Sequence, residues 1–415
     1  MKRISTILIW TLAILLMLPS GFGAKAASAD ASEAPPVIDG WVQVSTAEQL
    51  LYIDRNQELY LSENIRLADD VDLSGNEWVP LGGNGRAAYS GTFDGRGHVV
   101  SGIRVSDNTF QYTGFFGEST GILRNLGVEV EIDSGVYAGG LAGVLSGGRI
   151  ERSYSLGNVT GRLPGDAGSA VAGGLAAGAN NVSISESYSA VNVTVAFHAN
   201  MYVGGLVGSS GSSQIRNSYA TGAVANQDGP GGFVYLRSGG LAGFVINGLI
   251  ERVYATGHID ASNSAGFKMA QYGGIIGDLV GSSSLTSSVF NAETTGQTTG
   301  VGSSSAVDGH TTDEMQDQAT YEGWDFDKAW AISPTVNDGY PYLRPAILTT
   351  DLADGVKNEA YPPLHLEAWD GARGGIAWSA SGLPDGMTLD ASGLLYGTPA
   401  ESGTFVVEIA GTDAG

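Results

Sequence analysis

The segment GGLVGSSGSSQIRNSYATGAV at residues 204–224 and the segment GGLAGFVINGLIERVYATGHI at residues 239–259 are two copies of one pattern. Each copy starts with Gly-Gly-apolar-x-Gly and continues to an isoleucine that is followed, after a short interval, by a tyrosine. Five copies occur, starting at Gly139, Gly173, Gly204, Gly239 and Gly273, so successive copies begin 31 to 35 residues apart. In the same order, the later apolar residues are Ile150, Ile184, Ile215, Ile250 and Leu285.

This spacing, with short β-prone runs and no helical spacing of apolar residues, predicts an all-β solenoid. One copy cannot bury its own apolar face, so each copy must stack on its neighbours. The composition agrees, because glycine accounts for 63 of 415 residues and charged residues for only 15%, and tight corners need glycine while stacked turns tolerate few charges. A solenoid presents a long surface without an obligatory pocket, so we expect recognition rather than catalysis.

One aromatic residue recurs in every copy. In stacked turns these side chains should form a ladder along one side, and each stacked pair stabilises neighbouring turns by roughly 0.5–1.5 kcal/mol beyond area burial. We interpret the ladder as structural, with a sugar-binding stripe as the alternative. Its members are Tyr154, Tyr188, Tyr219, Tyr254 and Phe290.

The segments between copies vary in length and composition at residues 161–170, 197–202, 228–237 and 266–272. Insertions of this kind gather on one face of a solenoid, often the binding face. Their aromatic residues suit a protein or glycan partner, or they complete a third strand in each turn. These candidate ligand-binding residues are Phe197, Tyr202, Phe233, Tyr235, Phe267 and Tyr272.

The chain divides into six parts. Residues 1–26 have a basic start, an apolar run and a small-residue end, which predicts a secretory signal peptide; a retained N-terminal anchor is the alternative. A flexible lead-in at 27–44 precedes an N-terminal cap and first β turns at 45–110, where Ser45 to Glu48 form a predicted capping box. The remaining parts are the solenoid at 111–310, a C-terminal cap at 311–345 and a small β-sandwich at 346–415.

Charge and cysteine content narrow the possible partners. The net charge of −23 becomes −26 when Lys2, Arg3 and Lys25 leave with the signal peptide, so neither nucleic acid nor an anionic membrane is expected as a partner. Without cysteine, the exported chain depends on backbone ladders and apolar stacking. Beyond the leader, no segment is long enough to span a membrane.

Four motifs that imitate reactive or metal-binding sites have simpler interpretations. Asp70-x-Asp72-x-Ser74-Gly75 begins like a calcium loop but has Leu81 where the final glutamate is needed. Ser119 in GESTG is not followed by the helix that a nucleophile elbow requires. Asp94 could be one acid of a glycan-cleaving pair, but the glycine that follows it indicates a turn. The five histidines do not have metal-ligand spacing. We therefore predict no catalytic residue, metal or cofactor.

The copies at 204–224 and 239–259 resemble the GLUG motif of bacterial surface and adhesin-like proteins. DVDLSGNEWVPLG and GTFDGRGHVVSGI before the copies, and GWDF and GYPYLR after them, are similar to the segments that bracket GLUG arrays. Residues 348–415 resemble the Ig-like (cadherin-like) module that follows such arrays. The resemblance implies a right-handed β-helix with an Ig-like spacer on a bacterial surface, often assigned to adhesion.

GLUG repeats also precede metallopeptidase domains of the IgA-protease type, but this sequence contains no His-Glu-x-x-His. Three functions therefore remain open. The first is a non-enzymatic, exported surface protein that displays its loops to a protein or glycan. The second is an accessory region of a polysaccharide-acting enzyme, and the third is a purely structural surface repeat.

Overall fold

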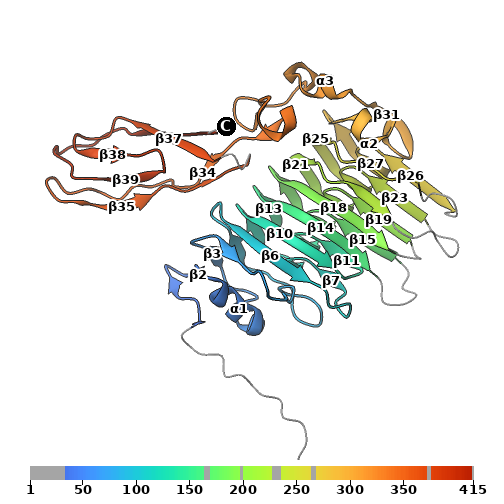
Figure 1. The fold of residues 1–415 in the computed structure, drawn as a ribbon, viewed down its shortest axis with the longest axis horizontal. Coiled ribbons are helices and arrows are strands. Elements are labelled where there is room, and N and C mark those ends of the chain that lie inside the picture. The colour runs from blue at the N-terminus through green and yellow to red at the C-terminus, as the bar shows by residue number, and fades with distance from the viewer. Residues whose placement is uncertain are drawn as a thin grey trace, which may run out of the picture.

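The computed structural model describes residues 33–162, 169–196, 200–226, 235–262, 268–371 and 375–413. The predicted signal peptide at 1–26 lies outside these residues, as do Phe197, Phe233 and Phe267. The described chain forms an all-β solenoid followed by a small β module (Figure 1). The predicted fold class is confirmed.

One turn of the solenoid consists of β11 (Tyr137–Gly139), β12 (Ala142–Ser146), β13 (Arg149–Glu151) and β14 (Tyr154–Arg162). Each of these strands pairs in parallel with its counterpart in the next turn: β15 (Ser169–Gly173), β16 (Ala176–Asn180), β17 (Ser183–Ser185) and β18 (Tyr188–Ala196). The following turns repeat the arrangement with β19 (Asn200–Gly204), β20 (Val207–Gly211), β21 (Gln214–Ala220), β22 (Val224–Asn226), β23 (Tyr235–Gly239), β24 (Ala242–Ile246), β25 (Leu249–Ala255), β26 (Met269–Gly273), β27 (Ile276–Val280), β28 (Ser284–Thr286) and β29 (Val289–Phe290).

Among the described residues, the stacked strands form three long sheets. Sheet A has 17 strands and contains two strands of each turn, such as β13 and β14. Sheet B has eight strands, from β8 (Phe116–Ser119) to the hairpin of β30 (Thr299–Val301) and β31 (Ser304–Asp308). Sheet C has six strands, from β7 (Tyr112–Thr113) to β26. The five copies therefore contribute equivalent strands to the same three sheets.

The core lies inside the solenoid, and equivalent residues of successive copies fill it in columns. Ile150, Ile184, Ile215 and Ile250 are fully buried and pair in register across β13, β17, β21 and β25. At the corner after each glycine pair, a second buried column is bonded from turn to turn through backbone N–H to O distances of 2.9 Å; it consists of Leu141, Leu175, Leu206, Leu241 and Ile275. Each copy covers the apolar side chains of the next, as a solenoid requires.

The glycines of the pattern are set by close backbone approaches. A Cβ on Gly140 would lie 2.5 Å from the carbonyl oxygen of Gly174 in the next turn, and a Cβ on Gly208 would lie 2.7 Å from that of Ala172 in sheet C. The second copy differs at the third glycine. Ala176 pairs with Ala142, so Ala177 occupies this position and Gly178 lies opposite Val144.

The N-terminal end is closed by α1 (Ala47–Arg55) and η2 (Gln57–Leu59), after β1 (Val37–Ile38) and β2 (Trp41–Val44). The N-cap of α1 is Thr46, whose side chain accepts from the N–H of Gln49, so the predicted capping box at Ser45 is wrong by one residue. The first turns contain β3 (Ile65–Leu67), β4 (Val71–Asp72), β5 (Thr92–Asp94), β6 (Val99–Val105), β9 (Ile122–Arg124) and β10 (Gly127–Asp133).

Residues 311–345 were expected to cover the last turn, but they run back along the outer face of sheet A (Figure 1). We call this segment the strap. Its capping box at Thr311 and Glu314 is present at the start of α3 (Thr312–Met315), near α2 (Ala292–Thr295). The other elements of the strap are η3 (Gln318–Thr320), β32 (Trp330–Ala331), η4 (Asn337–Gly339) and β33 (Tyr342–Leu343).

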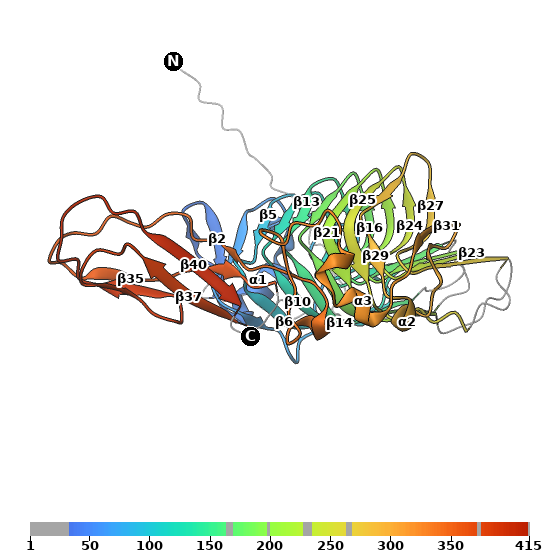
Figure 2. The same ribbon diagram turned by 90° about the horizontal axis from the view of Figure 1, so that it is seen from above.

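The Ig-like module extends beyond the N-terminal turns of the solenoid (Figure 2). Its described strands form three small antiparallel sheets: β34 (Ala346–Ile347) with β36 (Ala368–Trp369), β35 (Tyr361–His365) with β39 (Leu394–Gly397) and β38 (Met387–Leu389), and β37 (Ile376–Ser381) with β40 (Glu408–Asp413). Trp369 is 1% exposed in the same cluster as the strap aromatics, and Glu367 is bonded to Arg96 of the solenoid. The module is therefore attached to both the strap and the first turns.

Candidate functional site

Tyr202, Tyr235 and Tyr272 all lie in strands of sheet C, near the C-terminal ends of the segments that vary between copies. The interpretation in which these aromatics complete a third strand of each turn therefore describes their position. Because alternate residues of a strand point to opposite faces of the sheet, the position of each tyrosine in its strand decides whether it faces solvent.

Tyr202 lies in an outward row that runs the length of sheet C. Register places Tyr112, Tyr137, Val171, Tyr202, Arg237 and Gln271 at equivalent positions in β7, β11, β15, β19, β23 and β26. Tyr235 lies two residues before Arg237 and therefore on the same face. A facing row of sheet B contains Phe244 and Asp278, at equivalent positions in β24 and β27.

The two rows meet around Arg237. The Tyr202 and Phe244 rings are 5.3 Å apart, and the Arg237 guanidinium lies 5.4 Å and 5.2 Å from their centroids. Arg237 Nε donates to Asp278 Oδ2 at 2.7 Å, and the Asp278 side chain is only 8% exposed. The ion pair holds a cation beside two partly exposed aromatic rings, an arrangement in which cation–π attraction is effective.

We call this surface the aromatic strip and define it as Tyr112, Tyr137, Tyr202, Tyr235, Arg237 and Phe244. All six side chains are partly exposed. The rings of Tyr112 and Tyr137 are 5.4 Å apart, and Lys268 lies 5.6 Å from the ring of Tyr235. Sequence reasoning missed Arg237 and Phe244, although counting back in twos from Gly239 would have placed Arg237 on the face of Tyr235.

Tyr272 is separated from the strip. It pairs with Ser238, one position away from the outward row, and packs against the core. Its hydroxyl is buried without a hydrogen-bond partner among the described residues. Burial, with a smaller contribution from the charge of Asp260, raises the pKa of Tyr272 to about 12. Of the three predicted binding residues that the structure describes, Tyr202 and Tyr235 lie together on the exposed face and Tyr272 does not.

The tyrosine ladder lies on a different face, over sheet A. Tyr154, Tyr188, Tyr219 and Tyr254 stack with centroid distances of 4.9, 4.7 and 4.8 Å. Phe290 does not join them, because Val289 is the residue opposite Tyr254. Phe290 is fully buried in the main core, on the other face of the strand.

The strap and the residues that follow it cover this ladder, which forms one buried cluster with Trp324, Trp330 and Trp369. Trp324 and Trp330 lie 6.3 and 6.1 Å from the ring of Tyr254, whose hydroxyl donates to the Pro341 carbonyl at 2.7 Å. The four ladder tyrosines are at most 5% exposed. Burial raises the pKa of Tyr219 and of Tyr254 well above the usual range. The ladder is therefore closed to a sugar ligand in this conformation.

The motifs that imitate active sites form structural contacts. Ser119 ends β8, its hydroxyl donates to the Tyr89 carbonyl at 3.2 Å, and strand β9 rather than a helix follows it. Asp72 accepts from the N–H of Ser74 in a turn. Asp94 accepts from Arg124 Nε at 2.8 Å and Asn125 Nδ2 at 2.9 Å. In the described part of the chain, no group of His, Asp and Glu is arranged to hold a metal ion.

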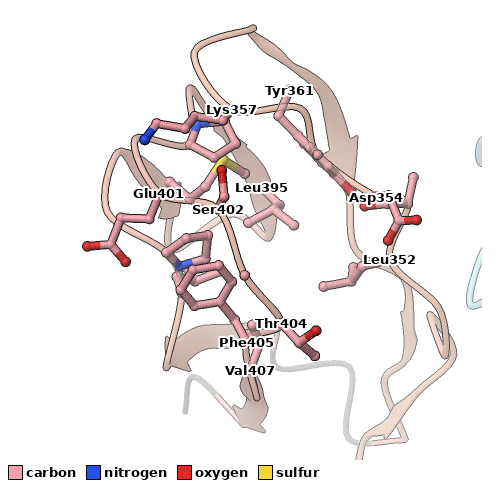
Figure 3. A pocket seen from close by; sticks show the side chains of 17 residues that line it. Leu352, Asp354, Lys357, Tyr361, Leu395, Glu401, Ser402, Thr404, Phe405 and Val407 are labelled. Atoms are coloured by element: carbon pink, nitrogen blue, oxygen red, sulfur yellow. Dashed lines mark hydrogen bonds between the residues drawn. The ribbon is translucent and has the colours of Figure 1, made fainter.

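The Ig-like module contains a hollow of about 500 Å³ (Figure 3). Tyr361 and Phe405 lie on opposite sides of it, with Leu395 between them. Val406 in the same segment as Phe405 is 84% exposed. The hollow is mainly the loosely filled interior of a thin module, and its lining includes Leu383 and Met387.

Comparisons with known proteins agree with this architecture. Residues 199–225 match the GLUG motif, and residues 349–415 match the family described as Putative Ig domain. A protein of Evansella cellulosilytica called a "Putative Gly-rich membrane protein" is 34% identical over 198 residues, which is 44% of this chain and 21% of the relative. The chain thus matches about a fifth of that relative's length.

A crystal structure described as a putative immunoglobulin A1 protease from Bacteroides ovatus matches 72% of this chain and 91% of its own, with a TM-score of 0.53 and 21% identity. Identity at this level supports a common fold only. Within the described residues, no helix has the length and apolar character needed to cross a bilayer. The chain is thus a β-solenoid that carries a match to the GLUG motif at residues 199–225, joined to a C-terminal module that matches the Putative Ig domain family.

Proposed function

We propose that this chain is a non-enzymatic, exported surface protein that binds a glycan through the aromatic strip. The observation that carries the proposal is the partly exposed pair of Tyr202 and Phe244, with Arg237 held beside both rings by its ion pair with Asp278. A flat aromatic face beside a fixed cation suits the apolar face and hydroxyls of a sugar ring. A protein partner at a host, matrix or cell surface is the alternative outcome, since aromatic residues and arginine are also enriched in protein interfaces.

The position of the strip supports display rather than structural use. It lies where the segments of variable length enter sheet C, and such segments of a solenoid commonly form its binding face. The resemblance to GLUG proteins and the membrane-protein name of the relative support a surface location, for which the predicted leader would provide export.

Two other functions are weighed against this one. An accessory region of a polysaccharide-acting enzyme would be favoured by two carboxyl groups that face one groove, but Asp94 is held by Arg124 and Asn125 and serves as a structural acceptor. A purely structural repeat would leave the strip without a ligand. The experiment below separates these outcomes.

The test measures binding of the full chain to a glycan array and to immobilised extracellular matrix proteins. We expect replacement of both Tyr202 and Phe244 by alanine to reduce glycan binding by about tenfold or more, because paired aromatic contacts are removed. Tyr396→Ala is the matched control, since Tyr396 is 40% exposed on the Ig-like module. Unchanged glycan binding by the double variant would contradict the proposal, and loss of binding only to matrix proteins would assign the strip to a protein partner.

A further inference from the structure

A second cleft lies between the first turns of the solenoid and the segment that enters the Ig-like module. Its volume is about 470 Å³, and four arginines line it together with Trp41. The four arginines are Arg66, Arg96, Arg124 and Arg152. We call it the arginine cleft. It is far from the aromatic strip in the fold, because it borders sheet A rather than sheet C.

Solenoid geometry brings these side chains together from successive turns. Arg66, Asp94 and Arg124 occupy equivalent positions in β3, β5 and β9. Arg152 follows β13 at a corner with a positive φ of 45°, and its Nε donates to Asn125 Oδ1 at 2.9 Å. Adjacent strands of a sheet are about 4.8 Å apart, so guanidinium groups from neighbouring turns point into one small volume.

The cleft carries more positive than negative charge, in a chain whose net charge is −23. Its lining contains four arginines and two acids, Asp94 and Glu367. Both acids are already bonded, Asp94 to Arg124 at 2.8 Å and Glu367 to Arg96 at 2.5 Å. Arg152 is paired with two acids outside the lining, Glu151 at 2.7 Å and Glu186 at 3.5 Å. Among the described residues, Arg66 is therefore the arginine of the cleft that has no carboxylate partner.

Arg66 is the arginine most available to a ligand. Its Nε and Nη2 donate to the amide oxygen of Gln43 at 3.2 and 3.0 Å, and no carboxylate lies within ion-pair distance among the described residues. A guanidinium that is bonded only to a neutral amide is stabilised when a carboxylate or sulfate binds to it, either in place of the amide or beside it. The two groups then form a bidentate, charge-assisted pair. Trp41, at the start of β2, supplies a partly exposed aromatic wall beside it.

We propose that the arginine cleft binds an anionic saccharide, with its carboxylate or sulfate on Arg66 and its ring against Trp41. Glu367 of the Ig-like module occupies Arg96 in the same cleft and competes with the ligand for that guanidinium. Ligand binding is therefore coupled to the contact between the solenoid and the module. The proposal does not depend on the aromatic strip and concerns a different face.

The test titrates the full chain with a carboxylated oligosaccharide (oligogalacturonate), a sulfated oligosaccharide (dextran sulfate) and a neutral one (maltohexaose), using calorimetry. We expect the anionic probes to bind with affinity that falls as salt rises, and we expect Arg66→Gln to leave the titration with the neutral probe unchanged, because the neutral probe does not bind in the cleft. Arg66→Gln should weaken binding by about tenfold, since one charge-assisted pair is lost. Arg104→Gln changes the net charge equally on an exposed side chain and should leave affinity unchanged.

Glu367→Gln should raise affinity, because Arg96 is then released for the ligand. Equal binding by Arg66→Gln and Arg104→Gln would overturn the site, as would the absence of binding by both anionic probes. Inorganic sulfate that binds as tightly as the saccharides would overturn the saccharide assignment. Tyr202→Ala should not alter the effect of Arg66→Gln on these titrations, so failure of this proposal and failure of the aromatic strip are distinguishable.

Discussion

The tyrosine ladder and the aromatic strip both repeat along the same solenoid, but they meet different surroundings. The four ladder rings stack at 4.7–4.9 Å and are at most 5% exposed, and Trp330 of the strap packs on Tyr219 and Tyr254. In the strip, Tyr202 and Phe244 are tilted against each other and stay partly exposed beside Arg237. An aromatic residue that recurs once per turn therefore does not reveal by itself whether it stabilises the fold or is open to a ligand. The two roles are distinguished by whether another segment of the chain, such as the strap, covers the rings.

The difference is tested most strongly by Tyr219→Ala. Tyr219 stacks on Tyr188 and Tyr254 and lies 6.1 Å from Trp330, so its loss leaves a cavity below the strap. We expect the free energy of unfolding to fall by roughly 3–5 kcal/mol, measured by urea unfolding, with faster protease cleavage within residues 311–345. Tyr219→Phe keeps the ring and is the control, expected to stay within about 1 kcal/mol. A cost no larger than that of the phenylalanine control would show that the ladder does not hold the strap.

A second test concerns the junction between sheets B and C that positions the strip. A Cβ on Gly208 would lie 2.7 Å from the Ala172 carbonyl oxygen, so Gly208→Ala should destabilise the chain by about 1–3 kcal/mol. Gly178→Ala is the matched variant, because its nearest neighbour would be Val144 Cγ2 at 3.4 Å. There we expect no loss and a gain of up to about 0.5–1 kcal/mol, since alanine suits a strand better than glycine. Equal effects in thermal unfolding would contradict the assignment of Ala177 to the third glycine position.

These contrasts also show what the sequence could and could not predict. The stacking of copies was predictable from the constant spacing of the glycine pair, the buried apolar residue such as Ile215 and the aromatic residue such as Tyr219. All three positions can meet their counterparts in the next copy only if the copies stack in register. The departure of Phe290 from the ladder had a visible signal: it follows Leu285 by five positions, whereas Tyr219 follows Ile215 by four. One extra residue reverses the face of a strand.

Other features had no local signal. The path of the strap depends on contacts between Trp324 or Trp330 and tyrosines many residues earlier, and no periodicity marks them. By contrast, the parity that places Tyr202 outward and Tyr272 inward could be counted back from the glycine pair that follows each residue. Tyr202 lies two residues before Gly204, whereas Tyr272 lies one residue before Gly273. The arginine cleft joins Arg66, Arg96 and Glu367, which are adjacent only after the Ig-like module folds back.

The polar attachment of the strap to the ladder is tested by Tyr254→Phe. This variant removes the hydroxyl that donates to the Pro341 carbonyl and accepts from Asn337 Nδ2 at 2.7 Å, while the stacked ring remains. Asn337 Nδ2 also donates to Pro341 at 2.8 Å, so the carbonyl keeps a partner. We expect a loss of about 1 kcal/mol in urea unfolding. A loss as large as that expected for Tyr219→Ala would mean that hydrogen bonds rather than stacking hold the strap.

Alkaline titration distinguishes buried from exposed tyrosines without replacing any ring by a smaller side chain. Burial raises the pKa of Tyr219 and Tyr254 in the folded chain, so the folded state retains their protons where the unfolded state loses them. The two buried tyrosines therefore contribute fully to the free energy of unfolding below the pKa that tyrosine has in the unfolded chain, and this contribution is lost as pH rises above that pKa. Tyrosinate absorbance should show a late step that coincides with unfolding, and Tyr219→Phe should reduce its amplitude by one tyrosine. An unchanged late step would place Tyr219 among the freely titrating residues.

The smallest expected effect on stability belongs to Tyr202→Ala, and it gives the comparison its sharpest form. The Tyr202 ring contacts Phe244 and Arg237 but is not covered by the strap, and the Arg237–Asp278 ion pair remains without it. We expect the free energy of unfolding to change by no more than about 0.5–1 kcal/mol, in the same urea assay used for Tyr219→Ala. If Tyr202→Ala were as destabilising as Tyr219→Ala, the strip would be a second structural ladder. The proposed glycan surface would then lose the feature on which it depends, a set of rings that the fold leaves open without needing them for stability.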